Sequence, residues 1–236
     1  MKTKELLDAR WKLICLALLA LLVASVNVAA YQFAKNQNLL PGPLASFTAF
    51  VWAQWFQVNA PLMLALGAVI LGSGLIAGEV SKGTIFFLLS KPVSRERILL
   101  TKYGVSLGSL FVVTLLGSIA IEGVSSVLGH SQDVLRLLVA TVLLWLGALF
   151  PLGLSLLFSV VFPDIIRPLA FTLLISVALL LPAIFPHGQD WSLLSYWSSN
   201  KAYLGGAFPL KEYLVCLVAA VLPLLGALVV FRRKAY

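Results

Sequence analysis

The stretch Leu13–Phe33, LICLALLALLVASVNVAAYQF, decides the class of fold because it contains no charged side chain. A helix needs about 20 consecutive apolar residues to cross the hydrocarbon core of a bilayer. A cleavable signal also begins with basic residues before an apolar run, but this run is long and further apolar runs follow. We therefore interpret it as the first membrane span, preceded by a short basic segment.

The composition of the whole chain supports the same interpretation. Of its 236 residues, 61% are hydrophobic and 11% are charged, whereas a soluble domain is about half apolar and about a quarter charged. Lipid must therefore surround most of the chain. We predict a single all-α integral membrane domain, residues 1–236, with six spans at about Leu13–Phe33, Val58–Ala77, Tyr103–Leu128, Leu137–Phe162, Pro168–Phe185 and Glu212–Phe231.

The distribution of basic residues predicts the orientation of these spans. Of the 17 lysines and arginines, all but four fall on the side of the membrane that holds the N-terminus; the four exceptions are Lys35, Arg136, Lys201 and Lys211. Cytoplasmic loops carry such an excess of Lys and Arg. We therefore expect both termini in the cytoplasm. The net charge of +8 is explained by this asymmetry, and no basic run interleaved with aromatics indicates nucleic-acid binding.

The longest charged interval lies between the second and third predicted spans, at Gly78–Tyr103, GEVSKGTIFFLLSKPVSRERILLTKY. Its pattern predicts a short amphipathic helix, a turn at Lys91-Pro92, and a basic helix capped by Ser94 that leads into the third span. A basic loop that binds anionic headgroups would account for the charge. A compact apolar helix beside a turn is better suited to docking into a groove of another protein.

This interval resembles the loop between the second and third spans of type-2 ABC transporter permeases. It is particularly similar to the branch associated with multi-copper enzyme maturation, bacteriocin export and ion export. The positions that match are Glu79, Lys82, Gly83, Thr84, Leu88, Leu89, Ser90, Pro92, Val93, Ser94, Arg95, Ile98, Leu99 and Lys102. Outside the interval the resemblance is limited to span count, orientation and loop lengths.

The resemblance implies a fold with a coupling helix within Glu79–Arg97 and two short re-entrant helices on the outer side within Pro186–Lys211. It also implies a permease in the cell membrane that pairs with a second permease copy and two cytoplasmic ATPase subunits, which bind ATP and Mg. The residues that would couple to the ATPase are Glu79, Lys82, Gly83, Thr84, Leu88, Leu89, Pro92, Ser94, Arg95 and Arg97.

The residues themselves give little sign of an enzyme. The chain has no HExxH motif and no Gly-rich loop ending in Lys-Ser or Lys-Thr, and its two histidines, His130 and His187, lie in predicted outer loops without spaced metal-ligand partners. We therefore expect no catalytic residue, metal or cofactor in this chain. Glu122 in the third span is a candidate functional residue, because ionisable groups at membrane depth are costly.

Two alternatives to the permease stay open. An ATP-independent secondary transporter or channel would carry ionisable residues inside its spans and often internal repeats, and here only Glu122 meets the first condition. A membrane scaffold or assembly factor would use the Gly78–Tyr103 interval for docking and move no substrate. Copurification of an ATPase separates the permease from the transporter, and a transport assay separates it from the scaffold.

Overall fold

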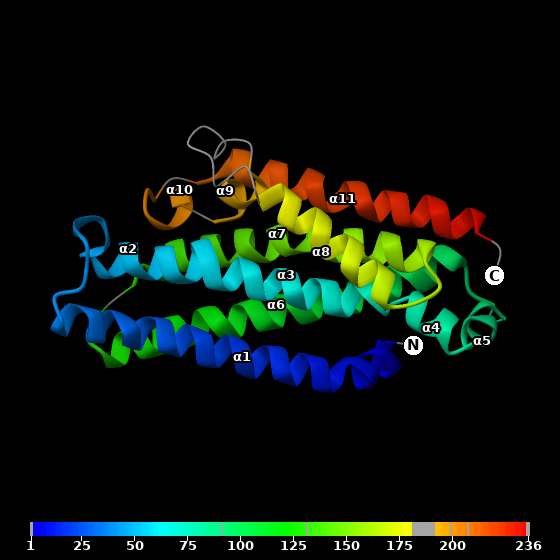
Figure 1. Ribbon diagram of the computed structural model, residues 1–236, viewed down its shortest axis with the longest axis horizontal. Coiled ribbons are helices and arrows are strands. Elements are labelled where there is room, and N and C mark those ends of the chain that lie inside the picture. The colour runs from blue at the N-terminus through cyan, green and yellow to red at the C-terminus, as the bar shows by residue number, and fades with distance from the viewer. Residues whose placement is uncertain are drawn as a thin grey trace.

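The computed structural model describes residues 2–90, 92–130, 132–180, 192–198, 200–206 and 208–234, and all regular structure in them is helical. The helices form an elongated bundle (Figure 1). They are α1 (Lys2–Asn36), the 3-10 turn η1 (Gly42–Leu44), α2 (Phe47–Val51), the π-helix η2 (Trp52–Asn59), α3 (Ala60–Ser73), α4 (Ala77–Ser81), α5 (Ile85–Leu89), α6 (Arg95–Val127), α7 (Val134–Val161), α8 (Ile166–Leu180), α9 (Leu193–Trp197), α10 (Asn200–Tyr203) and α11 (Leu210–Arg233).

Among the described residues, five helical stretches are long and apolar enough to cross a membrane: Ala9–Asn36, Phe47–Ser73, Arg95–Val127, Val134–Val161 and Leu210–Arg233. The fifth predicted span, Pro168–Phe185, corresponds to α8, which has 15 residues. At about 1.5 Å per residue, a helix of this length falls short of a hydrocarbon core about 30 Å thick. Residues 181–185 of that predicted span lie outside the described residues, so the crossing by α8, and with it the total of six spans, stays a prediction.

The second span differs from its predicted limits of Val58–Ala77. Helix begins already at Phe47, where Ser46 caps α2 by accepting a hydrogen bond from the Ala49 amide, and α2, η2 and α3 follow one another without a gap. The span ends at Ser73 rather than Ala77 because the chain turns at Gly74–Ile76. The aromatic stretch before residue 58 is therefore part of the span.

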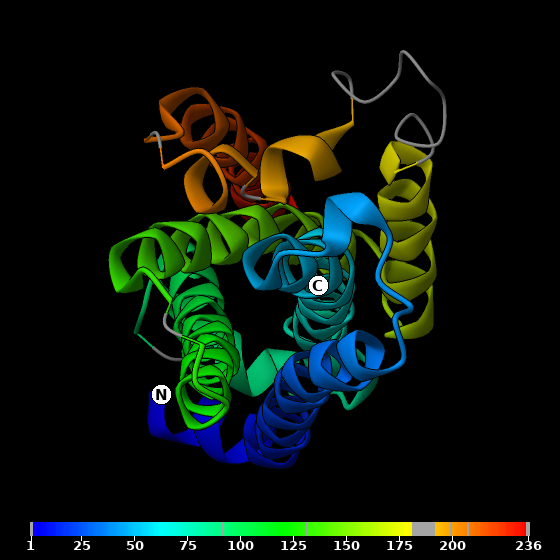
Figure 2. The ribbon, with the colours of Figure 1, turned by 90° about the vertical axis from the view of Figure 1, so that its left-hand side faces the viewer.

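Helix α7 is the centre of the bundle. It lies against α11, α3, α6 and α8, and Figure 2 shows it crossing between α11 and the remaining long helices. Small residues allow this close packing: a Cβ atom on Gly153 would lie 3.0 Å from Pro223 of α11. Small residues at helix interfaces are typical of membrane bundles, where backbones approach closely.

Both described ends of the chain lie at one end of the bundle, together with α4 and α5 (Figure 1). We call this the α4–α5 end. At the opposite end, α9 and α10 cover α7, and the Trp197 indole donates a hydrogen bond to the Leu144 carbonyl at 2.5 Å. Two short helices thus lie within Pro186–Lys211. Whether they are re-entrant stays a prediction, and residues 186–191, 199 and 207 lie outside the described part.

Candidate functional site

The break between α3 and α4 is fixed to the central helix by one side chain. The Ser159 hydroxyl of α7 donates a hydrogen bond to the Ser73 carbonyl at 2.9 Å. It also accepts from the backbone amides of Ile76 at 3.0 Å and Ala77 at 2.9 Å. Buried backbone amides and carbonyls need hydrogen-bond partners, and the Ser159 hydroxyl provides them where the helix is interrupted. The start of α4 is therefore attached to α7.

A single residue turns the chain from α4 into α5. Gly83 has a φ of +68°, in the left-handed region that favours glycine. A Cβ atom added to it would meet no other atom within 4 Å, so glycine is needed here for its backbone conformation and not for lack of space. Helix α5 then buries Ile85 and Leu88 against the core. Its other face points outward, with Phe86 62% exposed and Phe87 76% exposed. We call Phe86 and Phe87 the aromatic face of α5.

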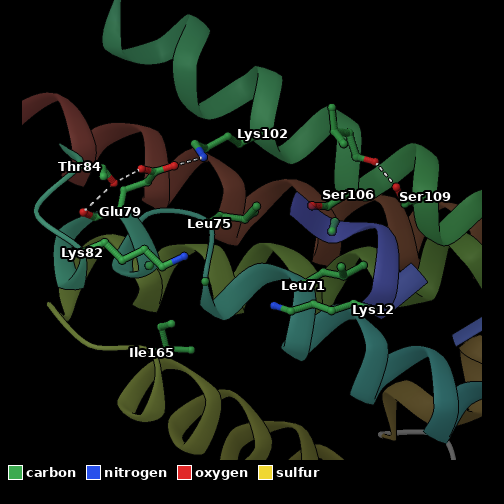
Figure 3. A pocket seen from close by; sticks show the side chains of 14 residues that line it. Lys12, Leu71, Leu75, Glu79, Lys82, Thr84, Lys102, Ser106, Ser109 and Ile165 are labelled. Atoms are coloured by element: carbon green, nitrogen blue, oxygen red, sulfur yellow. Dashed lines mark hydrogen bonds and ion pairs between the residues drawn. The ribbon is translucent and has the colours of Figure 1, made fainter. Parts of the chain in front are cut away.

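An ion pair attaches α4 to the start of α6 (Figure 3). Lys102 Nζ lies 3.0 Å from Glu79 Oε1, and the Lys102 side chain is only 3% exposed. The Thr84 hydroxyl donates to the other carboxylate oxygen of Glu79. A buried charge is costly unless it is paired and hydrogen-bonded. These contacts therefore hold α4, the residue before α5, and α6 together.

The N-terminus of α6 is joined to the C-terminus of α11. Ser94 caps α6 by accepting from the Arg97 amide at 3.3 Å, as the sequence predicts. The Arg95 guanidinium donates to the Phe231 carbonyl at 3.3 Å and to the Lys234 carbonyl at 2.5 Å. Cationic side chains interact favourably with the unpaired carbonyls of a helix C-terminus. Arg95 therefore faces α11.

Two further contacts complete this junction. Arg232 of α11 lies 2.7 Å from Glu96 of α6. Lys234 donates to the Val160 and Val161 carbonyls at the end of α7, each at 2.7 Å, and burial lowers the pKa of Lys234. We call Arg95, Glu96, Arg232 and Lys234 the clasp. It links the ends of α6, α7 and α11 beside α4 and α5.

The structure brings the predicted coupling residues to one end of the bundle but gives them different surroundings. Lys82, Gly83, Pro92, Ser94 and Arg97 are exposed, whereas Leu88 is buried and Leu89 is half-buried. The sequence predicts one short amphipathic helix here, whereas the chain turns at Gly83 and forms two helices, α4 and α5, so the aromatic face of α5 was missed. Also missed were Ser159 and, one turn earlier in α7, Ser155, which donates to the Val69 carbonyl of α3 at 3.1 Å; their i, i+4 spacing in an apolar span was the available signal.

Glu122 lies in the half of α6 remote from the α4–α5 end and is half-buried. One of its carboxylate oxygens is buried without a hydrogen-bond partner among the described residues. Burial, and then the charge of Glu122, raise the pKa of Tyr203 in α10 well above its usual value. Tyr203 itself donates to Gln132 at 2.6 Å. Glu122 therefore lies within a largely buried polar region, and its role stays a prediction.

The described residues contain no group of three or more potential metal ligands. His130 stacks on Phe47, with ring centroids 4.3 Å apart, and contacts Tyr31 edge-on. It is therefore part of an aromatic cluster at the end opposite α4 and α5. His187 lies outside the described residues.

Comparison with known proteins agrees with the architecture. No curated protein matches the chain in sequence. A family model described as "ABC-2 family transporter protein" matches residues 2–235, which is nearly the whole chain. Together with the five long apolar helices, this match makes the protein a multi-pass membrane protein. The chain belongs to the ABC-2 family of transporter proteins.

Proposed function

We propose that this chain is the membrane-spanning permease subunit of an ATP-driven exporter in the cell membrane. Two permease copies would form the pathway, and two separate ATPase subunits would bind ATP and Mg on the cytoplasmic side. In this arrangement the α4–α5 end faces the cytoplasm. The excess of Lys and Arg on that side of the sequence supports this orientation.

The observation that carries the proposal is the aromatic face of α5. Phe86 and Phe87 are 62% and 76% exposed on a five-residue helix that lies outside the long apolar stretches. Aromatic residues dominate the binding energy of protein interfaces when they enter a pocket of the partner. Exposed Arg97, in the first turn of α6, follows the helix in sequence and suits an acidic rim on the ATPase.

The contacts behind α5 suggest how movement of an ATPase would reach the spans. A push on α5 would act through Glu79 and Lys102 on α6, and through Ser159 on α7. Rigid, hydrogen-bonded connections transmit displacement, because packed helices change between discrete arrangements and do not deform continuously. Arg95 would act indirectly, since its guanidinium is engaged by α11.

The test is ATPase binding by the double variant Phe86→Ala/Phe87→Ala. We expect its affinity for the ATPase subunit to fall by about 30-fold or more, the effect of removing an interfacial hot spot of about 2 kcal/mol. Arg97→Glu should weaken binding further at low salt. Affinity would be measured by titrating the purified ATPase onto the permease in nanodiscs and following stimulation of ATP hydrolysis.

The control is Phe33→Ala/Phe208→Ala, which removes two phenylalanines that are 65% and 66% exposed. Neither lies in α4, α5 or the clasp, so this variant should bind the ATPase like the wild-type chain. Equal affinity of the two double variants would contradict docking at α5. A chain that purifies without any ATPase and still transports would favour a secondary transporter.

A further inference from the structure

A cavity of about 450 Å³ opens at the α4–α5 end, between α1, α3, α4 and α6. Figure 3 shows it from close by. One part of its lining is apolar, with Leu71 and Leu75 near the end of α3 and Ile165 just before α8. The other part is basic, with Lys12, Lys82 and Lys102. We call it the lysine cavity.

The charges in the lysine cavity do not cancel. Among the described residues of the lining, Glu79 is the acidic one, and its carboxylate pairs with Lys102 at 3.0 Å. Lys12 donates to the Ile70 carbonyl at 3.4 Å. A carbonyl carries no net charge, so this contact does not cancel the positive charge of Lys12. Lys12 and Lys82 point toward one another across the cavity (Figure 3). Like charges that face each other repel, and an anion between them would remove the repulsion.

The place of the cavity along the bundle favours an amphiphilic anion. Lys12 lies near the start of the apolar stretch Ala9–Asn36, and lysines at helix ends reach toward the headgroup level. Leu71 of the apolar lining lies at the end of the second span, and Leu75 lies just after it. A ligand with a charged head and a hydrocarbon body would therefore satisfy both parts. Ser106 adds a hydroxyl to the lining.

We propose that the lysine cavity binds the phosphate headgroup of an anionic phospholipid from the leaflet at the α4–α5 end. Lys12 and Lys82 hold the phosphate from two sides, while the Glu79–Lys102 ion pair keeps the cavity in shape. A phosphate with one or two negative charges matches the two lysines that Glu79 does not neutralise. The site belongs to the permease chain alone and does not depend on an ATPase.

The experiment measures lipid binding by the full-length chain, without ATPase, in detergent and by native mass spectrometry. The probes are dioleoyl phosphatidic acid, dioleoyl phosphatidylcholine and inorganic phosphate. The test variant is Lys12→Gln/Lys82→Gln. We expect its affinity for phosphatidic acid to fall about 30-fold, because a lysine near an anionic headgroup contributes about fivefold and the two contributions multiply. Lys12→Arg/Lys82→Arg should keep most of the affinity.

The matched control is Arg97→Gln/Arg233→Gln, which removes two exposed positive charges from the same end but outside the lysine cavity. It should bind phosphatidic acid within about twofold of the wild-type chain, and all chains should bind phosphatidylcholine weakly. An equal loss in test and control variants, or no loss in the test variant, would overturn the proposal. Lysine-dependent binding of inorganic phosphate with no preference for phosphatidic acid would overturn the lipid as the source.

Discussion

Gly83 shows how a single residue sets the direction of α5. Its φ of +68° places it in the left-handed region, which costs a residue with a side chain about 1–2 kcal/mol. We therefore expect Gly83→Ala to lower the free energy of unfolding by about 1 kcal/mol. For a chain of this size that corresponds to a fall in Tm of about 2–4 °C. Thermal unfolding of the purified permease in detergent would measure the change.

Gly104 provides the matched control for Gly83. It lies inside α6, has no atom within 4 Å of an added Cβ and no positive φ. Glycine inside a helix is less favourable than alanine by about 0.5–1 kcal/mol, so Gly104→Ala should raise the Tm slightly. If both variants shifted the Tm in the same direction, the argument from the φ of Gly83 would fail.

Local residue patterns were predictable where the physical cause is local. The sequence predicts Ser94 as a helix cap, and the structure confirms the hydrogen bond to the Arg97 amide. It does not predict the partner of Glu79, because Lys102 is 23 residues away and only the path of α4 and α6 brings the two together. The outward direction of Phe86 and Phe87 was equally inaccessible, since a five-residue helix has too few positions to define a face.

At the scale of elements, the clasp makes the end of α11 depend on α6. Arg95 donates to two carbonyls at that end, and hydrogen bonds to charged groups contribute about 1.5–3 kcal/mol each. We expect Arg95→Ala to speed amide hydrogen exchange in residues 228–234 by about tenfold or more. Arg97→Ala should leave exchange there unchanged, because Arg97 is exposed and outside the clasp. Equal protection in both variants would show that the clasp contributes no stability.

The limits of the elements were harder to predict than their existence. Long apolar runs predict the spans because lipid imposes a minimum length, and five of the six predicted spans have a long apolar helix in the structure. The end of the second span was misplaced by four residues, from Ser73 to Ala77. The span ends at Ser73 because the Ser159 hydroxyl binds the break there, and Ser159 is 86 residues away from Ser73 in the chain. No local sequence pattern carries that information.

At the scale of the whole molecule, the distribution of charge and the position of the chain ends both favour an even number of crossings, which stays a prediction. The basic residues predict that both termini lie on one side, and the structure places both described ends at the α4–α5 end (Figure 1). Helix α7 also ends there, beside the clasp. The central position of α7 itself was not predictable, because its apolar residues differ little from those of the lipid-exposed helices and only packing distinguishes them.

The number of crossings gives the last prediction, which concerns α8. Since α7 ends at the α4–α5 end and α9, α10 and the start of α11 lie at the opposite end (Figure 1), we predict that the chain between α7 and α9 crosses the membrane once. In a chain with Cys15→Ala and Cys216→Ala, we expect Ile166→Cys to react with an impermeant maleimide only after cells are permeabilised. Asn200→Cys should react in intact cells, and Phe87→Cys should behave like Ile166→Cys. Reaction of residues 166 and 200 from the same side would mean that α8 does not cross, and the six-span topology would be wrong.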